Sequence, residues 1–600
     1  MKKLKAGVAF GDYISQEKYT GSTKHYDGGK VNSFRYLFLP IFAGIIFILL
    51  LIKLFSLQIL EGSYYKRLAD NNRTKTVIVH APRGIIFDRN GKPLVFNVPG
   101  FRESPPDGGG KVNLLTQEEA LPFLAQKRSS LEIDSLREYP YKEAFAHVLG
   151  YVGQISVEEL KQDKYLDYSG GDIIGKAGIE QRWEQTLKGV DGKKLVEVDS
   201  QGDEIRQLGE ADPVSGRDIQ LTLDAALQNT TYEAMKEAKK GAAIVSTPKG
   251  EILALFSAPS FDPNLFTMGA EYETATDSAY RDISSILLDG QNQPLLNRSI
   301  SGTYPPGSTF KLITAAAGLD NHIIDDKYTV SDTGVLRLGA FSFANWYFTQ
   351  YGRTEGDVDV VTGIKRSNDI FFYKLAEKIG VNGISEMAAK FGVGKALGLD
   401  MDGEENGTLP TTSWKEKVIG EQWYLGDTYH YGIGQGYLLT TPLQVNGWTQ
   451  AVANSGNLYK PYLFKKTKPQ IITSKFLEEK TVSLIRQGMI EACEPTGVAW
   501  PFFDFKVKNP KLKIDGKNFM EVPESTTSAS FKDYRKISIA CKTGTSQHGG
   551  EDSLPHAWIT LYAPAYNPQI VVTVLSESSG EGSNEAAPIA KKILDYYFSR

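Results

Sequence analysis

The chain has 600 residues, more than one hydrophobic core usually organises, so at least two domains are expected. Its composition, 41% hydrophobic and 23% charged, is that of a folded protein and excludes extensive disorder. The formal net charge of −4 gives no reason to expect a nucleic-acid partner. A single bridge between Cys493 and Cys541 is compatible with the sequence but not implied by it. Cys541 is expected to pack as a small hydrophobic side chain.

The first element in chain order is an apolar segment at 34–55. Tyr36 to Ile52 carries no charged residue, and Lys53 can extend its ammonium to an interface, so the segment is long enough to span a bilayer of roughly 30 Å. Residues 1–33 are rich in lysine and are expected to form a cytoplasmic tail. A cleaved signal peptide and a buried core helix are the alternatives. We favour an uncleaved, single-pass anchor in the cell (inner) membrane.

Residues 56–222 are predicted to form a mainly β pedestal. Alternating apolar residues lead into Asn90-Gly91, the preferred pair of a type I′ hairpin turn. Helices are predicted around 116–126, around 156–164 and from Ile179 to Leu187, and residues 192–222 alternate like strands.

Residues 223–600 are predicted to form a second domain of the α+β class. It begins with a helix at 225–240 and an apolar hairpin at 242–255, and helices follow near 368–379, 384–391 and 475–493. Three strands (537–542, 557–563 and 569–575) and a helix (584–597) come last. This order predicts an antiparallel sheet that is built from both ends of the domain and flanked by helices.

The segment around Ser308 and Lys311 is the first candidate for chemistry. Pro305-Pro306-Gly307 stops the preceding chain, and an alanine-rich run predicts a helix that begins near Ser308. A serine and a lysine three positions apart share one helix face, so a buried lysine there can act as a base toward the hydroxyl. Ser-x-x-Lys occurs four times in the chain, however, and a capping serine with a solvated lysine explains any one copy equally well.

Two further segments could complete such a site. Ser367-Asn368-Asp369 precedes an apolar helix, where Ser367 alone would be read as an N-cap. The segment Lys542-Thr543-Gly544-Thr545 follows a predicted strand, and Gly544 there would let a substrate backbone lie close.

The three segments occur in the order Ser-x-x-Lys, Ser-x-Asn/Asp, Lys-Thr-Gly, and together they are specific. The chain resembles the class B penicillin-binding proteins, and within them the rod-elongation branch. The resemblance covers roughly residues 60–600. Beyond the three motifs it includes segments 82–91, 146–151, 175–180, 259–266, 426–428, 432–437 and 556–558.

This resemblance implies a penicillin-binding/β-lactamase-like transpeptidase domain on an elongated pedestal, and peptidoglycan D,D-transpeptidase activity during cell-wall elongation. It implies that Ser308 attacks a D-Ala-D-Ala stem peptide, with Lys311 as the neutral general base and Ser367 as a proton relay. Lys542, Thr543 and Thr545 would hold the terminal carboxylate, and the N–H groups of Ser308 and Thr545 would form the oxyanion hole. β-Lactams would acylate the same serine.

The resemblance also implies the surroundings of the enzyme. The donor would be a stem peptide and the acceptor an amine on a neighbouring strand, and no cofactor is expected. A SEDS-family glycosyltransferase and other proteins of the rod complex are the expected partners, with the catalytic domain outside the membrane. The head between the Asn90-Gly91 hairpin and His147 has only about fifty residues, fewer than in the relatives, and residues 500–535 are interpreted as an insertion.

Two departures from the family pattern bear on the site. Aspartate stands at 369 where asparagine is commoner, and because an ionised carboxylate only accepts hydrogen bonds, we expect Asp369 to pair with Lys311 or Lys542. Some relatives bind zinc through Asp, Asp, His and Cys between the first two motifs. Asp332 matches the first ligand, but Asn345 and Tyr351 stand at the next two and the region has no cysteine, so no metal is expected.

Several other functions fit parts of the pattern. A D,D-carboxypeptidase or a β-lactamase would use water as the acceptor, and the anchor and pedestal argue against both. A bifunctional class A enzyme would need a glycosyltransferase motif, which 60–240 does not show. A membrane β-lactam sensor would need a multi-span receptor region. A scaffold that activates a SEDS polymerase is disfavoured by the intact motifs, although one protein could have both roles.

Overall fold

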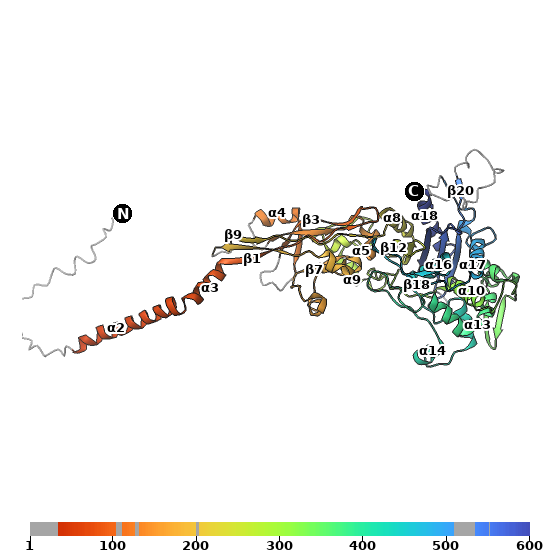
Figure 1. Cartoon of the computed structure of the whole chain (residues 1–600), viewed down its shortest axis with the longest axis horizontal. Helices are drawn as coiled ribbons and strands as arrows, with labels where there is room; N and C mark the ends of the chain where they lie inside the picture. The colour runs from red at the N-terminus through yellow and green to blue at the C-terminus, as the bar shows by residue number, and fades with distance from the viewer. Residues whose placement is uncertain (1–33, 104–110, 126–130, 200–202, 509–533, 551–552) are drawn as a thin grey trace, which may run out of the picture. The chain divides into compact units, whose positions relative to one another are not determined.

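The computed structural model describes residues 34–103, 111–125, 131–199, 203–508, 534–550 and 553–600 (Figure 1). By their contacts these residues divide into two units, one within Met1–Thr76 and Leu195–Leu208 and the other within Val77–Lys194 and Gly209–Arg600. The expected cytoplasmic tail and most of the interpreted insertion at 500–535 lie outside the described residues.

The first unit contains the predicted membrane segment. Helix α2 (Phe34–Phe55) continues through a π-helical turn (Ser56–Leu60), and Leu37–Leu60 is long and apolar enough to cross a membrane. None of this span is buried against the protein, which argues against a core helix. Helix α3 (Gly62–Arg73) and strand β1 (Thr74–Val79) follow, and β1 joins a three-stranded sheet with β8 (Gly192–Val198) and β9 (Glu204–Ala211).

The second unit begins with a five-stranded sheet. Its strands are β2 (Ile86–Phe87), β3 (Pro93–Glu103), β4 (Asn113–Thr116), β5 (Leu131–Glu138) and β10 (Ile219–Gln220). The predicted hairpin joins β2 to β3, but its turn is not type I′, because Gly91 has a positive φ of 83° and Asn90 does not. The Asp88 carboxylate instead accepts from the N–H groups of Asn90 (2.7 Å) and Lys92 (2.8 Å), and this side chain holds the turn.

Short helices and a buried ion-pair cluster support this sheet. The helices are α4 (Gln117–Ala125), α5 (Ala146–Leu149), α6 (Gly178–Arg182) and α7 (Glu184–Leu187), and a two-stranded sheet is formed by β6 (Val152–Gln154) and β7 (Ile173–Gly175). The region around 156–164, predicted helical, contains only two 3-10 turns. Arg83 lies 2.9 Å from Glu180 and 2.8 Å from Glu184, and Arg137 lies 2.7 Å from Glu180. Because the two arginines compensate the buried carboxylates, this part of the pedestal resists rearrangement.

The sheet of the α+β domain has the order β12-β11-β23-β22-β21. Its strands are β11 (Gly241–Ser246), β12 (Ile252–Ala258), β21 (Ala540–Ser546), β22 (His556–Ala563) and β23 (Ile570–Ser576), and all neighbours are antiparallel. The prediction of a sheet built from both ends of the domain is therefore confirmed. β21 lies at its edge.

Helices cover both faces of this sheet. α8 (Ala225–Met235) and α18 (Ala586–Ser599) lie side by side on one face (Figure 1), and α16 (Pro442–Ala453) covers the other. Successive residues of β11 belong to different hydrophobic clusters, since Ile244 packs with the α16 side and Val245 with the α8 and α18 side. Two separate cores thus fix the sheet between them.

This domain has further helices among its described residues. They are α9 (Ile283–Leu288), α10 (Lys311–Asp320), α11 (Trp346–Tyr351), α12 (Val360–Arg366), α13 (Asp369–Lys390), α14 (Thr412–Val418), α15 (Leu425–Gly432) and α17 (Glu479–Ala492). α13 is interrupted at Gly380, whose φ of 75° and ψ of 164° are not helical, so it matches the two helices predicted there.

Cys493 and Cys541 form a disulfide, which corrects the expectation that Cys541 packs as a free hydrophobic side chain. Their Cα atoms are 6.0 Å apart, and the bridge joins the end of α17 to β21 one residue before Lys542. Spacing in the sequence could not reveal this pairing, because it depends on α17 lying against the edge strand.

Reduction of this bridge is expected to lower the free energy of unfolding by about 4 kcal/mol, because it closes a loop of 48 residues in the unfolded chain. Denaturant unfolding with and without reductant measures the effect. A Cys493→Ala/Cys541→Ala variant is the control and should not respond to reductant. Equal midpoints for the oxidised and reduced wild type would contradict the prediction.

His80 makes the stability of the pedestal depend on pH. Burial alone would lower its pKa, but contacts with Asp191 (3.4 Å) and Glu132 (3.6 Å) outweigh burial and raise the pKa of His80 to about 9. Because its folded-state pKa is raised, protonated His80 stabilises the folded pedestal. This stabilisation is fully present below the ordinary pKa of 6.5 and is lost as the pH rises through about 9. We expect the difference in melting temperature between wild type and His80→Gln to shrink between about pH 6.5 and about pH 9.5. A difference that stays constant with pH would refute the role of His80.

Candidate active site

Ser308 lies in a 3-10 turn (Gly307–Phe310) that leads directly into α10, close to where the helix was predicted to begin. Gly307 has a positive φ of 54°, and a Cβ there would lie 2.9 Å from the Thr545 carbonyl oxygen. The Gly307 N–H donates to the Gly434 carbonyl (2.9 Å), and the indole N–H of Trp558 donates to the Pro305 carbonyl (3.1 Å). The two hydrogen bonds join the turn to the Gly434 segment and to β22 (His556–Ala563), and the close approach of Gly307 to Thr545 places it against β21; the Ser308 side chain stays half-buried.

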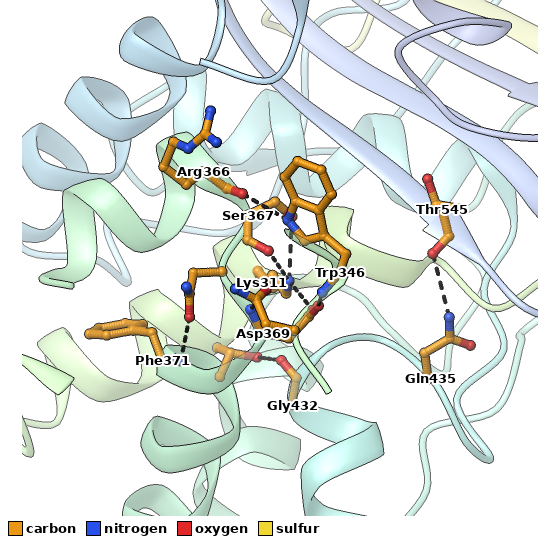
Figure 2. Close-up of polar contacts among 12 residues, drawn as sticks. Lys311, Trp346, Arg366, Ser367, Asp369, Phe371, Gly432, Gln435 and Thr545 are labelled. Atoms are coloured by element: carbon orange, nitrogen blue, oxygen red, sulfur yellow. Dashed lines mark hydrogen bonds and ion pairs between the residues drawn. The ribbon is translucent and has the colours of Figure 1, made fainter. Parts of the chain in front are cut away.

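Lys311 is fully buried, and its Nζ lies among three oxygen atoms. It is 2.6 Å from Asp369 Oδ1, 2.8 Å from the Ser367 carbonyl oxygen and 3.3 Å from Ser367 Oγ (Figure 2). Burial lowers the pKa of Lys311 below its ordinary value, and the Asp369 carboxylate opposes this effect. The expected pairing of Asp369 with one of the two lysines is therefore made with Lys311.

Ser367 connects the two buried lysines. It ends α12 in the left-handed conformation (φ 54°, ψ 37°), and the N-cap of α13 is Asn368, whose side chain accepts from the Phe371 N–H (2.9 Å). Ser367 is thus not the N-cap that its position alone would indicate. Its Oγ lies 2.8 Å from Lys542 Nζ as well as 3.3 Å from Lys311 Nζ. One hydroxyl can therefore exchange protons with either amine.

Lys542 comes from the edge strand β21 and is also fully buried. Its Nζ donates to Ser367 Oγ and to the Thr543 carbonyl (2.9 Å). Burial, and then the neighbouring charge of Lys311, hold the pKa of Lys542 well below its ordinary value. Lys542 lies inside β21 and not at its end as predicted, because the strand continues through the Lys-Thr-Gly motif.

A cleft of about 1470 Å³ opens above these lysines. Six of the candidate residues line it: Ser308, Ser367, Asp369, Thr543, Gly544 and Thr545. All eight candidate residues are therefore brought together, six in the cleft wall and two lysines beneath it. Packing favours glycine at position 544, because a Cβ there would lie 3.0 Å from Thr309 Cγ2 and 3.1 Å from the Pro306 carbonyl oxygen. A larger residue would push β21 away from the Ser308 turn.

Two residues contribute to the site that the sequence motifs do not include. The Trp346 N–H donates to Asp369 Oδ2 (3.0 Å), and the Asn345 side chain accepts from the Asp369 N–H (3.1 Å). In the sequence, Asn345 stands out only as a mismatch to a zinc ligand of some relatives. Its amide donates to Asp332 Oδ2 (3.0 Å), an oxygen that also accepts from the Asn368 amide (2.9 Å). No sequence motif marks a contact of this kind.

The arrangement can activate a serine for acyl transfer. Ser308 lines a cleft beside a lysine of lowered pKa, and a second hydroxyl links that lysine to another amine. The Thr545 carbonyl accepts from the Gln435 side chain (3.5 Å), which connects β21 to the segment that follows α15 (Figure 2).

Comparisons with known proteins agree with this chemistry. Residues 241–595 match the penicillin binding protein transpeptidase domain, and residues 126–221 match the penicillin-binding protein dimerisation domain. Peptidoglycan D,D-transpeptidase MrdA of Haemophilus influenzae is 32% identical over 93% of this chain and 91% of its own length. The enzyme of the same name from Escherichia coli is 32% identical over 92% and 93%.

Solved structures are also similar. Penicillin-binding protein PBP2 of Helicobacter pylori, solved in complex with MreC, superposes with a TM-score of 0.69 at 26% identity, covering 87% of this chain and 98% of that one. A chain from a peptidoglycan synthase complex, described as coordinating polymerization and crosslinking, gives a TM-score of 0.66 at 28% identity, with 94% and 98% covered.

Replacing Asp369 by asparagine is expected to lower the pKa of Lys311 further. The substitution removes the nearby negative charge that stabilises the ammonium and leaves the burial unchanged. An NMR pH titration of ¹³Cε-labelled lysine, with the Lys311 signal assigned from Lys311→Arg, measures the change. A Lys311 titration midpoint in Asp369→Asn at or above that of the wild type would contradict this electrostatic account.

Proposed function

From the membership of this chain in the penicillin-binding protein transpeptidase family, which makes it a serine-type peptidoglycan D,D-transpeptidase, we propose that Ser308 is the nucleophile of the reaction. The observation that carries this proposal is the position of Ser367 Oγ between Lys311 Nζ (3.3 Å) and Lys542 Nζ (2.8 Å) beneath the cleft that Ser308 lines.

The first half-reaction forms an acyl-enzyme. Neutral Lys311 takes the proton of the Ser308 hydroxyl as Oγ bonds to the carbonyl carbon of the penultimate D-alanine. The N–H groups of Ser308 and Thr545 stabilise the oxyanion, a contribution of about 3–4 kcal/mol in comparable sites. The C–N bond then breaks, and the departing amine of D-alanine receives its proton through Ser367.

The second half-reaction transfers the acyl group to an amine. The acceptor amine attacks the Ser308 ester, loses a proton to the relay, and the Ser308 oxygen leaves with a proton from Lys311. The product is a new amide between two stem peptides. A β-lactam follows the first half-reaction only, since its ring opens onto Ser308 and its amine stays attached.

The edge strand is proposed to orient the donor. Thr543 and Thr545 lie in the cleft wall, where their hydroxyls can bind the terminal carboxylate. Lys542 is buried behind them and exchanges protons with Ser367, and a bound carboxylate would favour its ammonium form. Gly544 keeps β21 close to the Ser308 turn.

The position of the apolar helix suggests the membrane topology and the domain boundaries of the chain. The apolar helix and the family fit a single-pass protein of the inner membrane. We place 1–33 in the cytoplasm, 34–55 in the membrane, and the pedestal (56–222) and transpeptidase domain (223–600) outside it, because peptidoglycan is crosslinked there.

Partners are proposed from the relatives. One similar protein was solved with MreC and another in a peptidoglycan synthase complex. We propose that this chain acts during cell-wall elongation beside a SEDS-family polymerase and proteins of the rod complex.

Labelling with a fluorescent penicillin tests the nucleophile. Ser308→Ala is expected to abolish labelling, because it removes the hydroxyl that forms the ester in the proposed reaction. Ser63→Ala is the matched control, since Ser63 opens another Ser-x-x-Lys sequence on the exposed face of α3 and should label like the wild type. Persistent labelling of Ser308→Ala would overturn the proposal.

Muropeptide analysis after depletion separates an enzyme from a scaffold. Loss of crosslinks with glycan strands retained is expected for the transpeptidase. Loss of glycan strands without a specific crosslinking defect would indicate that activation of a polymerase is the main role.

A further inference from the structure

The Asp369 carboxylate has two contacts on opposite sides. Oδ1 lies 2.6 Å from Lys311 Nζ, and Oδ2 accepts from the backbone N–H of Trp346 at 3.0 Å (Figure 2). Trp346 is the first residue of α11, and its indole N–H donates to the Arg366 carbonyl (3.0 Å). The partner of the buried lysine is therefore attached to α11 by a single backbone hydrogen bond.

The residue before Trp346 holds Asp369 from its backbone side. The Asn345 side-chain oxygen accepts from the Asp369 N–H (3.1 Å), and the Asn345 amide donates to Asp332 Oδ2 (3.0 Å). Asn345 is completely buried. The Asn345 side-chain oxygen accepts a hydrogen bond and its amide nitrogen donates one, so the amide group can take only one orientation. The side chain therefore acts as a rigid spacer between Asp332 and Asp369.

Asp332, Asn345, Glu355 and Asn368 form one buried group, here called the Asp332 cluster. Asn368 donates to Asp332 Oδ2 (2.9 Å) and to Glu355 Oε2 (3.1 Å), and the Glu355 N–H donates to Asp332 Oδ2 (3.1 Å). Glu355 in turn pairs with Arg366 at 2.5 Å. A buried polar network whose members are satisfied in this way is rigid, and opening it is costly.

Helix α11 also forms part of the cleft wall. Trp346, Tyr347, Gln350 and Tyr351 all line the cleft, and the Gln350 amide donates to Glu581 across it. The same six-residue helix thus touches the space where substrate binds and holds the carboxylate beside Lys311.

We propose that Asn345 and the Trp346 N–H are positioning groups that hold Asp369 in place beside Lys311, with the Asp332 cluster as their support. The proposal rests on the proposed function, in which Lys311 is the base. Asn345 and the Trp346 N–H do not touch the reacting atoms. They act through Asp369, whose displacement would misplace the Lys311 amine relative to Ser308.

The first test compares Asn345→Ala with Asn264→Ala in the full-length protein. Asn264 is a similarly buried asparagine whose amide contacts Asp262 Oδ1 (2.8 Å) and the Tyr139 backbone, far along the chain from the site. Stopped-flow acylation by a chromogenic β-lactam separates the dissociation constant of the non-covalent complex from the first-order acylation constant. Both variants lose comparable buried hydrogen bonds, so general destabilisation is matched.

Asn345→Ala is expected to lower the acylation constant by about tenfold to a hundredfold, the usual cost of a misplaced catalytic group, with the dissociation constant unchanged. Asn264→Ala should acylate like the wild type. Equal acylation constants for the two variants would overturn the proposal.

The second test disrupts the Trp346 N–H contact with Asp369 and remains informative if Asn345→Ala does not fold. Trp346→Pro and Trp346→Ala both remove the indole, but only proline removes the N–H. Proline is well tolerated at the first position of a helix, and Asn345, with φ −77° and ψ 137°, already has the conformation that a following proline requires. Its Cδ replaces the amide hydrogen and pushes against Asp369 Oδ2, so proline both removes the donor and displaces the carboxylate.

Trp346→Pro is expected to acylate about tenfold more slowly than Trp346→Ala at an equal dissociation constant. Equal acylation constants in this pair would also overturn the proposal. If the wild type labels and Ser308→Ala does not, such a result refutes only the positioning role. If Ser308→Ala labels as well as the wild type, both the proposed function and this inference fail.

Discussion

The burial of Lys311 beside Asp369 is the constraint on which the rest of the site depends. A fully buried amine favours the neutral form, whereas a carboxylate 2.6 Å away favours the ammonium. The two effects oppose each other, so the proton on Lys311 can be given up and regained during one reaction cycle. A base held in this balance is sensitive to small movements of its partner.

The fold meets this constraint by bringing together three segments that are distant in the sequence. The Ser308 turn lies against β21 because Gly307 and Gly544 have no side chains to separate them. Ser367 sits at the junction of α12 and α13 in a left-handed conformation that directs its carbonyl and hydroxyl oxygens to Lys311. The edge position of β21 leaves one side of the strand open to a substrate chain.

Sequence reasoning identifies the residues whose chemical type is itself the signal. A Ser-x-x-Lys segment, a Ser-x-Asp segment and a Lys-Thr-Gly segment in fixed order are enough to indicate acyl transfer. The apolar anchor and the sheet built from both ends of the domain are also predictable, because hydrophobic pattern and strand order determine them.

Other features have no signature in a single sequence. The Cys493–Cys541 bridge depends on α17 lying beside β21, and the turn at Asn90-Gly91 is set by the Asp88 side chain. Asn345 contacts Asp369 across 24 positions through one amide. Such contacts follow from tertiary placement, which local propensity does not encode.

The most direct test of the account is to identify the atom that carries the acyl group. Full-length protein is mixed with a D-Ala-D-Ala stem peptide, quenched with acid and digested, and its peptides are examined by mass spectrometry. The account predicts an ester on Ser308 with one D-alanine released per acyl group. An acyl group on any other residue, or D-alanine release with Ser308 never modified, would contradict it.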